Sequence, residues 1–173
     1  DRSRLISRNG NDLTPSFPEI ERALRGLPYP GLVVDGEAVV HDEHGLPSFE
    51  RLQKRGRIRR RTDVLRASME MPASLYAFDV LAIGGYDLRS LPLIERKSLL
   101  RELLPTTGPI RYCDHIEERG EAMFEHAERL QLEGVVGKDA TSRYADGRSE
   151  RWLKVRAIES DDFLVIGYTA PKG

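Results

Sequence analysis

The sequence has little cysteine, no excess of charge of either sign and no long hydrophobic run. Its single cysteine, Cys113, excludes an internal disulfide framework and a cysteine zinc site, which fits a reducing compartment. Lys and Arg total 27 against 28 Asp and Glu, so any binding to nucleic acid must come from local patches. No apolar run approaches the roughly 20 residues of a membrane-spanning helix. The first residues, Asp1 to Arg4, do not resemble a signal peptide, so we expect a soluble, cytoplasmic protein with no membrane partner.

The apolar content is sufficient for one folded core, because 39% of the 173 residues are hydrophobic. Apolar periodicity and the turns marked by Gly and Pro predict alternating short strands and amphipathic helices. The predicted strands cover residues 31–40, 75–83, 110–113, 134–137, 152–157 and 163–168. The predicted helices cover residues 18–24, 47–57, 92–104 and 121–130. Several strands follow one another without a crossover helix, which favours an α+β fold with mainly antiparallel sheets over a doubly wound parallel sheet.

Charged residues interrupt segments that otherwise read as buried strands. Glu37 lies between Val34 and Val40, and Glu133 lies just before Val135. Because burying an unpaired charge costs several kcal/mol, each carboxylate must face solvent, a cation or a ligand. Taken singly, each is equally well explained as a surface residue on a half-buried strand.

Five short motifs follow one another along nearly the whole chain. They are Ser7-Arg8-Asn9, Asp35-Gly-Glu37, Tyr76-Ala-Phe-Asp79, Glu133-Gly-Val-Val-Gly-Lys138 and Trp152-Leu-Lys-Val-Arg156. The connecting pieces Leu88 to Leu100, Tyr144 to Ser149 and Gly167 to Gly173 also match. Together these segments resemble the adenylation domain of ATP-dependent DNA ligases, especially the ligase domain of the bacterial end-joining ligases of the LigD type.

This resemblance implies a fold, an activity and a set of ligands. The fold would be a nucleotidyltransferase adenylation domain, ATP-grasp-like in its architecture, over residues 1–160, with 161–173 as the start of an OB-fold domain or its linker. The substrates would be ATP, which supplies AMP, and nicked or broken duplex DNA, with Mg²⁺ or Mn²⁺ as metal. The implied setting is DNA repair, recombination and non-homologous end joining on the bacterial nucleoid, with a Ku-type end-binding protein as a candidate partner.

The resemblance also implies roles for residues that would hold the nucleoside and its metal. Arg8 corresponds to the arginine that contacts the nucleotide sugar, and Glu37 to the carboxylate beside ribose and metal. Phe78 corresponds to the aromatic residue that stacks on adenine, an interaction worth roughly 1–3 kcal/mol per base. Without the neighbouring motifs, Phe78 would be read as an ordinary core phenylalanine.

Three further residues would act at the phosphates. Glu133 corresponds to the metal-binding glutamate, and Lys154 and Arg156 correspond to the two cations on the α-phosphate. Ligases of this family perform three in-line displacements at phosphorus, so catalysis depends on positioning and on neutralising negative charge. The family more often has lysine at the position of Arg156, so a phosphate contact is retained there while a proton-donor role becomes doubtful.

The nucleophilic lysine of the family is not found. It belongs to a Lys-x-Asp-Gly motif expected shortly before Ser7, and no such motif occurs in these residues. Lys138 is followed by Asp139-Ala140, so we do not assign it this role. A fragment of a longer protein is favoured over omitted residues or a degenerate relative, and we expect the chain to be inactive alone.

A basic run offers candidate DNA contacts. Between Arg51 and Arg66 eight residues are basic and only Asp63 is acidic. The candidate phosphate contacts are Arg55, Arg57, Arg59, Arg60, Arg61 and, further along the chain, Arg148. A solvated, flexible loop between a helix and a strand explains the run equally well.

Two other classes of function stay open at this point. An RNA ligase or a GTP-using capping enzyme would share the same chemistry, and nucleotide selectivity would separate them from a DNA ligase. A non-catalytic relative that binds nucleic acid would have lost its lysine, although the intact Glu133, Lys154 and Phe78 count against such decay.

Overall fold

The computed structural model describes residues 3–130, 132–145, 147 and 150–157. The chain divides into two compact units, which we describe separately. Unit 1 comprises Asp1–His115 and Asp139–Ser149, and unit 2 comprises Ile116–Lys138 and Glu150–Gly173. The strand predicted at 163–168 and the OB-fold entry predicted at 161–173 lie outside the described residues.

Unit 1 is built on a four-stranded sheet. The strands are β1 (Val33–Val40), β2 (Ala73–Ile83), β3 (Tyr86–Asp87) and β4 (Ile110–Tyr112). β2 is the central strand, antiparallel to β1 and β3 and parallel to β4. The predicted α+β class with mainly antiparallel pairing is confirmed. The parallel pair arises because an entire helix intervenes between β2 and β4, which gives the chain the length to return to the same end of the sheet.

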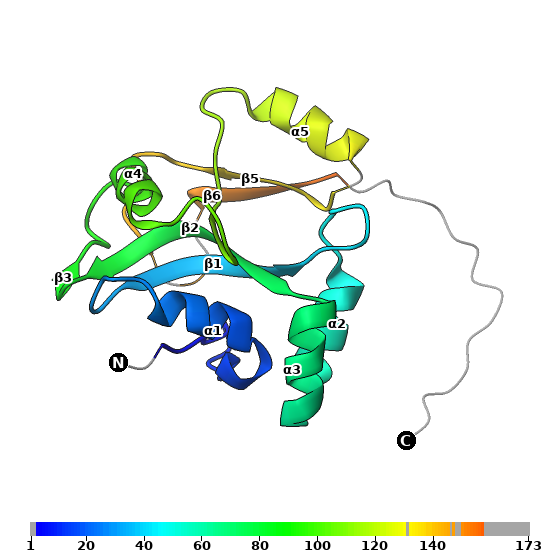
Figure 1. The fold of residues 1–173 in the computed structure, drawn as a ribbon. Coiled ribbons are helices and arrows are strands. Elements are labelled where there is room, and N and C mark those ends of the chain that lie inside the picture. Colours follow the sequence, from blue (N-terminus) through cyan, green and yellow to red (C-terminus); the bar gives the residue numbers. More distant parts are fainter. Residues whose placement is uncertain (1–2, 131, 146, 148–149, 158–173) are drawn as a thin grey trace, which may run out of the picture. The chain divides into compact units, whose positions relative to one another are not determined.

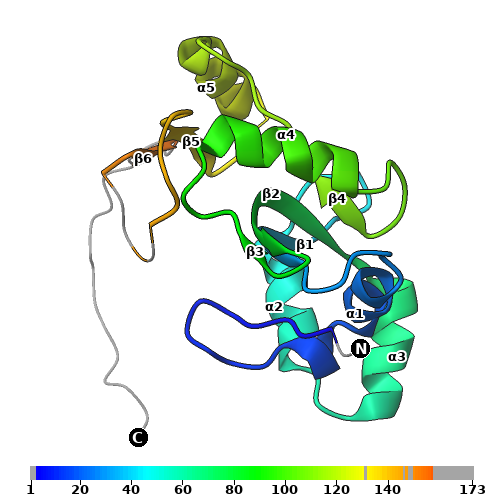
Figure 2. The ribbon, with the colours of Figure 1, turned by 90° about the vertical axis from the view of Figure 1, so that its left-hand side faces the viewer.

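Helices cover both sides of this sheet. After a short 3₁₀ turn at Thr14–Ser16, α1 (Pro18–Arg25) lies on one side and α4 (Leu93–Leu103) on the other, as both views show (Figures 1 and 2). Pro18 begins α1, a position where its missing N–H costs nothing. Both helices were predicted with nearly these bounds.

The connection between β1 and β2 is more helical than the sequence suggests. It contains α2 (Phe49–Arg57), capped by the Ser48 side chain, which accepts a hydrogen bond from the Arg51 N–H, and then α3 (Arg61–Glu70). The flexible loop, one of the two alternatives left open for the basic run, is therefore excluded over α3. This helix buries only Val64 and Ala67, a stripe too narrow to stand out among the surrounding charges.

The core of unit 1 consists of two apolar clusters. The first joins α1 to the β1–β2 pair, and its buried members are Phe17, Ile20, Val40, Ala73 and Leu75. The second joins β2 to α4 and β4, and its buried members are Ala77, Val80, Leu100, Leu104 and Ile110. The apolar face of β2 is thus filled along its length, which leaves its other face for polar groups.

The described residues of unit 2 form one helix and a two-stranded ribbon. The helix is α5 (Gly120–Arg129), and β5 (Gly134–Lys138) pairs antiparallel with β6 (Trp152–Arg156). Gly134 has a φ of 146°, and a Cβ atom there would stand 2.1 Å from the Val155 carbonyl oxygen, so only glycine fits this close approach. Among the described residues, none of the helices has the length and apolarity needed to cross a membrane.

Candidate functional site

A β-bulge in β2 determines which side chains share the polar face of the sheet. Opposite Asp35 and Gly36 of β1, the pairing skips one residue of β2, Phe78, so that Asp35 faces Asp79 and Glu37 faces Tyr76. Residues directly opposite each other on antiparallel strands point to the same face. The extra residue therefore places Tyr76 and Asp79, three positions apart, on one face with Asp35 and Glu37.

Phe78 is the residue that the bulge leaves without a partner in the β1 register. Its side chain is half-buried rather than enclosed in either apolar cluster. Bulges occur often beside active sites, where they change the direction in which a side chain points. The position fits the predicted role of Phe78 in stacking on a base, which stays a prediction.

Around the exposed Glu37, the structure adds neighbours that the sequence analysis missed. The Tyr76 hydroxyl lies 3.1 Å from His41 Nε2, with the two rings edge to face at 5.8 Å between centroids. The guanidinium of Arg111 lies 6.0 Å from the centre of the Tyr76 ring. His41 and Arg111 are separated from Tyr76 by 35 residues in either direction, so no local spacing could have indicated this cluster.

A buried ion pair, between Asp79 and Arg96, lies on the same face of the sheet. Asp79 and Arg96 are both fully buried, with Arg96 Nε 2.7 Å from Asp79 Oδ1 and Nη2 2.8 Å from Oδ2. Arg96 also donates to the carbonyls of Leu91 and Ser142. This pair fixes the start of α4 to β2 and holds the segment that contains Ser142 in place.

The segment that follows Ser142 is attached to the sheet by a tyrosine. The Tyr144 hydroxyl donates to Asp35 Oδ2 at 3.1 Å, and the Arg96 guanidinium lies 5.9 Å from the centre of the Tyr144 ring. The sequence contained Asp79 and Arg96 within two matching motifs, and the cost of a buried charge could have suggested that they pair. Tyr144 lies in a connecting piece that resembles the family, but it carries no charge, so the same argument could not have indicated its contact with Asp35.

Arg8 lies in a tight turn that precedes α1. Ser7 and Asn11 close the turn by a backbone hydrogen bond of 2.9 Å, and Gly10 supplies the positive φ of 79° that it requires. The Arg8 side chain is exposed at this turn, so it is available to a ligand.

In unit 2 the predicted phosphate-binding cations lie on one face of the ribbon. Val136 pairs with Lys154, Gly134 with Arg156 and Lys138 with Trp152. By the same rule of opposite residues, three cations from two strands therefore share a single face. Lys138 is placed over the Trp152 ring, with Nζ 3.8 Å from its centre, a contact that favours the charged ammonium.

Glu133 joins this group of cations. Its Oε1 accepts a hydrogen bond from Lys154 Nζ at 2.5 Å. That hydrogen bond lowers the pKa of Glu133, helped by the charge of Lys154 and, less, by that of Arg156. The structure thus brings together Glu133, Lys154 and Arg156, and it places Arg8, Glu37 and Phe78 in unit 1.

The carboxylates fit one kind of metal site. Within the described ranges, no three His, Cys, Asp or Glu side chains gather as a protein-only metal cluster. Mg²⁺, however, is usually held by one or two carboxylates together with substrate phosphates and water. The exposed Glu133 and Glu37 each fit that donor set, Glu133 beside cations that attract phosphate.

Only some side chains of the basic run, Arg51 to Arg66, are exposed at the surface. Arg55 is completely buried, with Nη2 2.8 Å from Glu19 Oε1 and its guanidinium 5.3 Å from the centre of the Phe17 ring. The prediction that Arg55 contacts DNA is therefore wrong, because its charge is already used inside the protein. Arg57, Arg59, Arg60 and Arg61 are exposed, while Arg148 lies outside the described residues.

Comparison with known proteins agrees with the motifs and with this geometry. Residues 1–156 match the family described as the ATP dependent DNA ligase domain. The chain therefore belongs to the ATP-dependent DNA ligase domain family. This result disfavours an RNA ligase or a capping enzyme.

The curated relatives include an end-joining protein and a probable DNA ligase. The chain is 36% identical over 172 residues to the multifunctional non-homologous end joining protein LigD of Pseudomonas aeruginosa, covering 98% of the chain and 19% of that protein. It is 37% identical to a probable DNA ligase of Streptomyces coelicolor, covering 94% and 33%. The chain thus spans between about a fifth and a third of the curated relatives that it matches.

Solved structures share the fold. A mycobacterial DNA ligase D complexed with ATP and MES aligns with a TM-score of 0.70 at 30% identity, over 88% of this chain and 47% of that one. The ligase domain of LigD from M. tuberculosis aligns with the same TM-score at 33% identity, over the same shares. The predicted adenylation-domain fold is confirmed by these alignments.

Proposed function

We propose that this chain is the nucleotide-binding part of an ATP-dependent DNA ligase that seals nicked or broken duplex DNA during repair and end joining. The observation that carries the proposal is the group of Glu133, Lys154 and Arg156 on one ribbon, in a chain of the ligase family. The likeness to end-joining ligases supports two finer proposals, a Ku-type partner and a location on nucleoid DNA.

The proposed reaction has three steps, each a displacement at phosphorus. A lysine nitrogen attacks the α-phosphorus of ATP, loses its proton, and pyrophosphate leaves. A 5′-phosphate oxygen of DNA then attacks the same phosphorus and releases the lysine. Finally, the 3′-hydroxyl attacks the DNA phosphorus, AMP leaves and the phosphodiester is complete. Since negative charge gathers on phosphate oxygens in each step, the site needs fixed cations.

Unit 2 would supply those charges. Lys154 and Arg156 extend from the same face of β6 and would contact the α-phosphate, Arg156 through two donors at once. Glu133 would bind Mg²⁺ or Mn²⁺, which when bound neutralises phosphate charge as a Lewis acid. The pair between Glu133 and Lys154 holds the carboxylate and the ammonium beside each other, which supports this proposal.

Unit 1 would recognise the nucleoside. Phe78 would stack on adenine, with its direction determined by the bulge, and Arg8 would contact the sugar from its exposed turn. Glu37 would accept hydrogen bonds from ribose or assist the metal. The proposal gives Lys138 no role as the nucleophile, because Asp139-Ala140 follows it and the Lys-x-Asp-Gly motif is absent there.

Titration calorimetry of the chain with ATP, and with GTP as the competing nucleotide, tests this proposal. Lys154→Met should weaken ATP binding on the order of tenfold or more, because it removes a hydrogen bond to a charged group. Arg129→Met is the matched control, since it removes an exposed cation of unit 2 from α5 and should change ATP affinity by less than about twofold. Tighter binding of GTP than ATP, or equal effects of the two variants, would contradict the proposal.

A further inference from the structure

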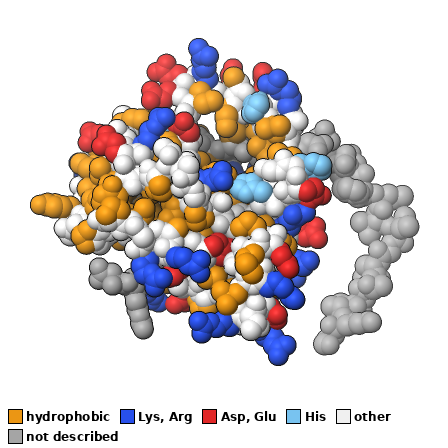
Figure 3. All heavy atoms as spheres, viewed as in Figure 1, with side chains coloured by type: hydrophobic (Ala, Val, Ile, Leu, Met, Phe, Trp, Pro, Cys, Tyr) orange, Lys and Arg blue, Asp and Glu red, His pale blue; other side chains and the backbone are white. Residues whose placement is uncertain are grey.

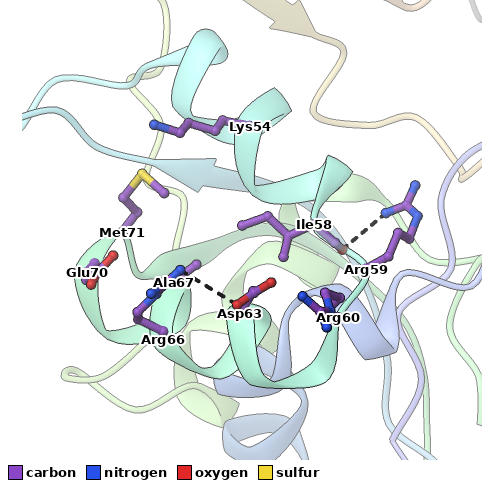
Figure 4. A pocket seen from close by; sticks show the side chains of 9 residues that line it. All are labelled: Lys54, Ile58, Arg59, Arg60, Asp63, Arg66, Ala67, Glu70 and Met71. Carbon is purple, nitrogen blue, oxygen red and sulfur yellow. Dashed lines mark hydrogen bonds and ion pairs between the residues drawn. The ribbon is translucent and has the colours of Figure 1, made fainter.

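Some basic side chains of unit 1 lie outside the residues assigned to the nucleotide. Lys54, Arg59, Arg60 and Arg66 line a hollow of about 560 Å³ between α2 and α3 (Figure 4), and Lys and Arg side chains gather over these helices (Figure 3). These four residues belong to the basic run, which is already a candidate for DNA contacts. Arg111 of β4 belongs neither to that run nor to the lining of the hollow, and its place beside Tyr76 indicates a different role.

Three side chains from three strands form a row across the polar face of the sheet. Glu37 of β1 is directly opposite Tyr76 of β2, and Tyr76 is in register with Arg111 of β4. Residues paired across neighbouring strands point to the same face. Because β1 and β4 pair with opposite edges of β2 here, Tyr76 stands between a carboxylate residue and a guanidinium residue.

Contacts with two other side chains hold the Tyr76 ring in place. Its hydroxyl lies 3.1 Å from His41 Nε2, and the two rings meet edge to face. The guanidinium of Arg111 lies 6.0 Å from the centre of the Tyr76 ring, at a distance where the ring still attracts a cation. Tyr76 is half-buried, whereas Glu37 and Arg111 are exposed. The fixed member of the row is therefore the aromatic ring in its middle.

Glu37 and Arg111 carry opposite charges but do not pair. Neighbouring strands lie about 4.8 Å apart, so about 9.6 Å, two such spacings, separates the backbones at these two residues. Their side chains are long enough to close that distance, and opposite charges attract. Within the part of the chain that the structure describes, however, neither makes an ion pair. The bulky ring at the intervening position is a physical reason for this separation.

We propose that Tyr76 is a positioning residue that keeps Arg111 away from Glu37, so that the Glu37 carboxylate stays available to the ribose or the metal of the nucleotide. The inference rests on the proposed function, which gives Glu37 that contact. An arginine paired with Glu37 would occupy the carboxylate oxygens with its forked donors, and a ligand would have to break that pair in order to bind. In this role Tyr76 acts through Glu37 and needs no contact with the nucleotide of its own.

Titration calorimetry of the chain with ATP tests the inference by rescue. Tyr76→Ala should weaken ATP binding by about fivefold, the upper end of what an exposed ion pair contributes. Tyr76→Ala combined with Arg111→Gln should bind ATP within about twofold of wild type, because the competing cation is gone. Arg111→Gln alone is the matched control and should also stay within about twofold of wild type, since the ring already keeps this cation from Glu37.

A crystal structure of Tyr76→Ala without nucleotide provides a readout that does not depend on ATP. In it the guanidinium of Arg111 should lie within about 4 Å of the Glu37 carboxylate, the distance of an ion pair. A second variant, Tyr76→Phe, retains the ring but lacks the hydroxyl that contacts His41. It should bind ATP as wild type does, because the ring still separates the two charges.

Three results would overturn the inference. If Arg111→Gln fails to restore ATP binding to Tyr76→Ala, then Tyr76 either contacts the nucleotide itself or only fills space. Equal losses of affinity in Tyr76→Phe and Tyr76→Ala would assign the effect to the hydroxyl instead of the ring. A guanidinium that stays apart from Glu37 in the crystal structure of Tyr76→Ala would remove the proposed cause.

Lys154→Met separates this inference from the proposed function. If Lys154→Met weakens ATP binding and Tyr76→Ala does not, the ligase function stands and the inference fails. If Lys154→Met has no effect on ATP binding but Arg111 reaches Glu37 in the crystal structure of Tyr76→Ala, the proposed function fails, while the separation of the two charges by Tyr76 stands.

Discussion

Removing Arg96 should destabilise unit 1 more than almost any other single surface or core change. Arg96→Met keeps most of the side-chain volume but leaves the carboxylate of Asp79 fully buried without its cation. The remaining donor to that carboxylate is the N–H of Val80 at 2.8 Å. The carbonyl of Leu91 also loses its hydrogen bond from the guanidinium.

The magnitude follows from the burial of both partners. Breaking a buried pair by removing one member costs about 3–5 kcal/mol, because the other charge stays buried and uncompensated. Domains of this size are stable by about 5–15 kcal/mol in total. With a urea dependence of about 2 kcal/mol per M, the midpoint of unfolding should fall by about 2 M.

Circular dichroism in urea is the suitable assay, because the only tryptophan, Trp152, belongs to unit 2. The chain contains a matched control in Asp87 and Arg89. Their side chains make the same two-point contact, with Nε–Oδ1 at 3.0 Å and Nη2–Oδ2 at 2.8 Å, but both are more than half exposed. Arg89→Met should shift the midpoint far less than Arg96→Met, since water and salt screen an exposed pair.

A double variant tests the cause of the effect. Asp79→Leu combined with Arg96→Met removes both charges, so its cost should be well below the sum of the two single costs. A double cost equal to that sum would show that the two side chains act independently. A midpoint for Arg96→Met close to that of Arg89→Met would refute the argument from burial altogether.

Three further changes test the candidate site. Phe78→Ala should weaken ATP binding by about 5- to 150-fold in calorimetry if the ring stacks on the base, and wild-type affinity would return Phe78 to a purely structural role. Gly134→Ala should destabilise unit 2 by at least about 2 kcal/mol, since the new Cβ meets the Val155 carbonyl at a φ of 146°; unchanged hydrogen exchange in β5 would contradict this. Lys154→Met should raise the pKa of Glu133 toward its ordinary value in an NMR titration. Because the pKa of Glu133 is lowered in the folded state, the contribution of this pair to stability exists above the unfolded pKa and is lost as pH falls through the folded pKa. An unchanged pKa would show that the pair does not persist in solution.

The parts of the fold that the sequence predicted are those with strong local patterns. Residues 31–40 and 75–83 were predicted as strands, and the structure has β1 at Val33–Val40 and β2 at Ala73–Ile83. Runs of apolar residues bounded by Gly and Pro determine such elements almost alone. The helix at α4 was equally clear, because Leu93 and Leu100 recur at helical spacing.

The features that were missed depend on contacts between distant residues. α3 is held by the packing of Val64 and Ala67, a narrow apolar stripe among charged residues. The burial of Arg55 is decided by Glu19, 36 residues earlier. The bulge at Phe78 is a matter of register between two strands, which no propensity of a single strand reports. The family resemblance indicated Glu133 and Lys154 as site residues. Their hydrogen bond could not be predicted, because it depends on the pairing of β5 with β6.

Burial divides the charged residues of this chain into two kinds, and this division bears directly on function. Asp79, Arg96 and Arg55 have left water entirely and are each paired, so their charges are used in holding elements together. Glu37 and Glu133 stand in segments just as apolar but are exposed, Glu133 beside Lys154, so a ligand can reach both carboxylates. A variant that neutralises a member of the first kind should therefore change stability before it changes ligand affinity. For Glu37→Gln the order should be reversed: nucleotide binding should weaken while the urea midpoint stays within error of wild type. A lowered midpoint with normal nucleotide binding would instead place Glu37 among the structural charges.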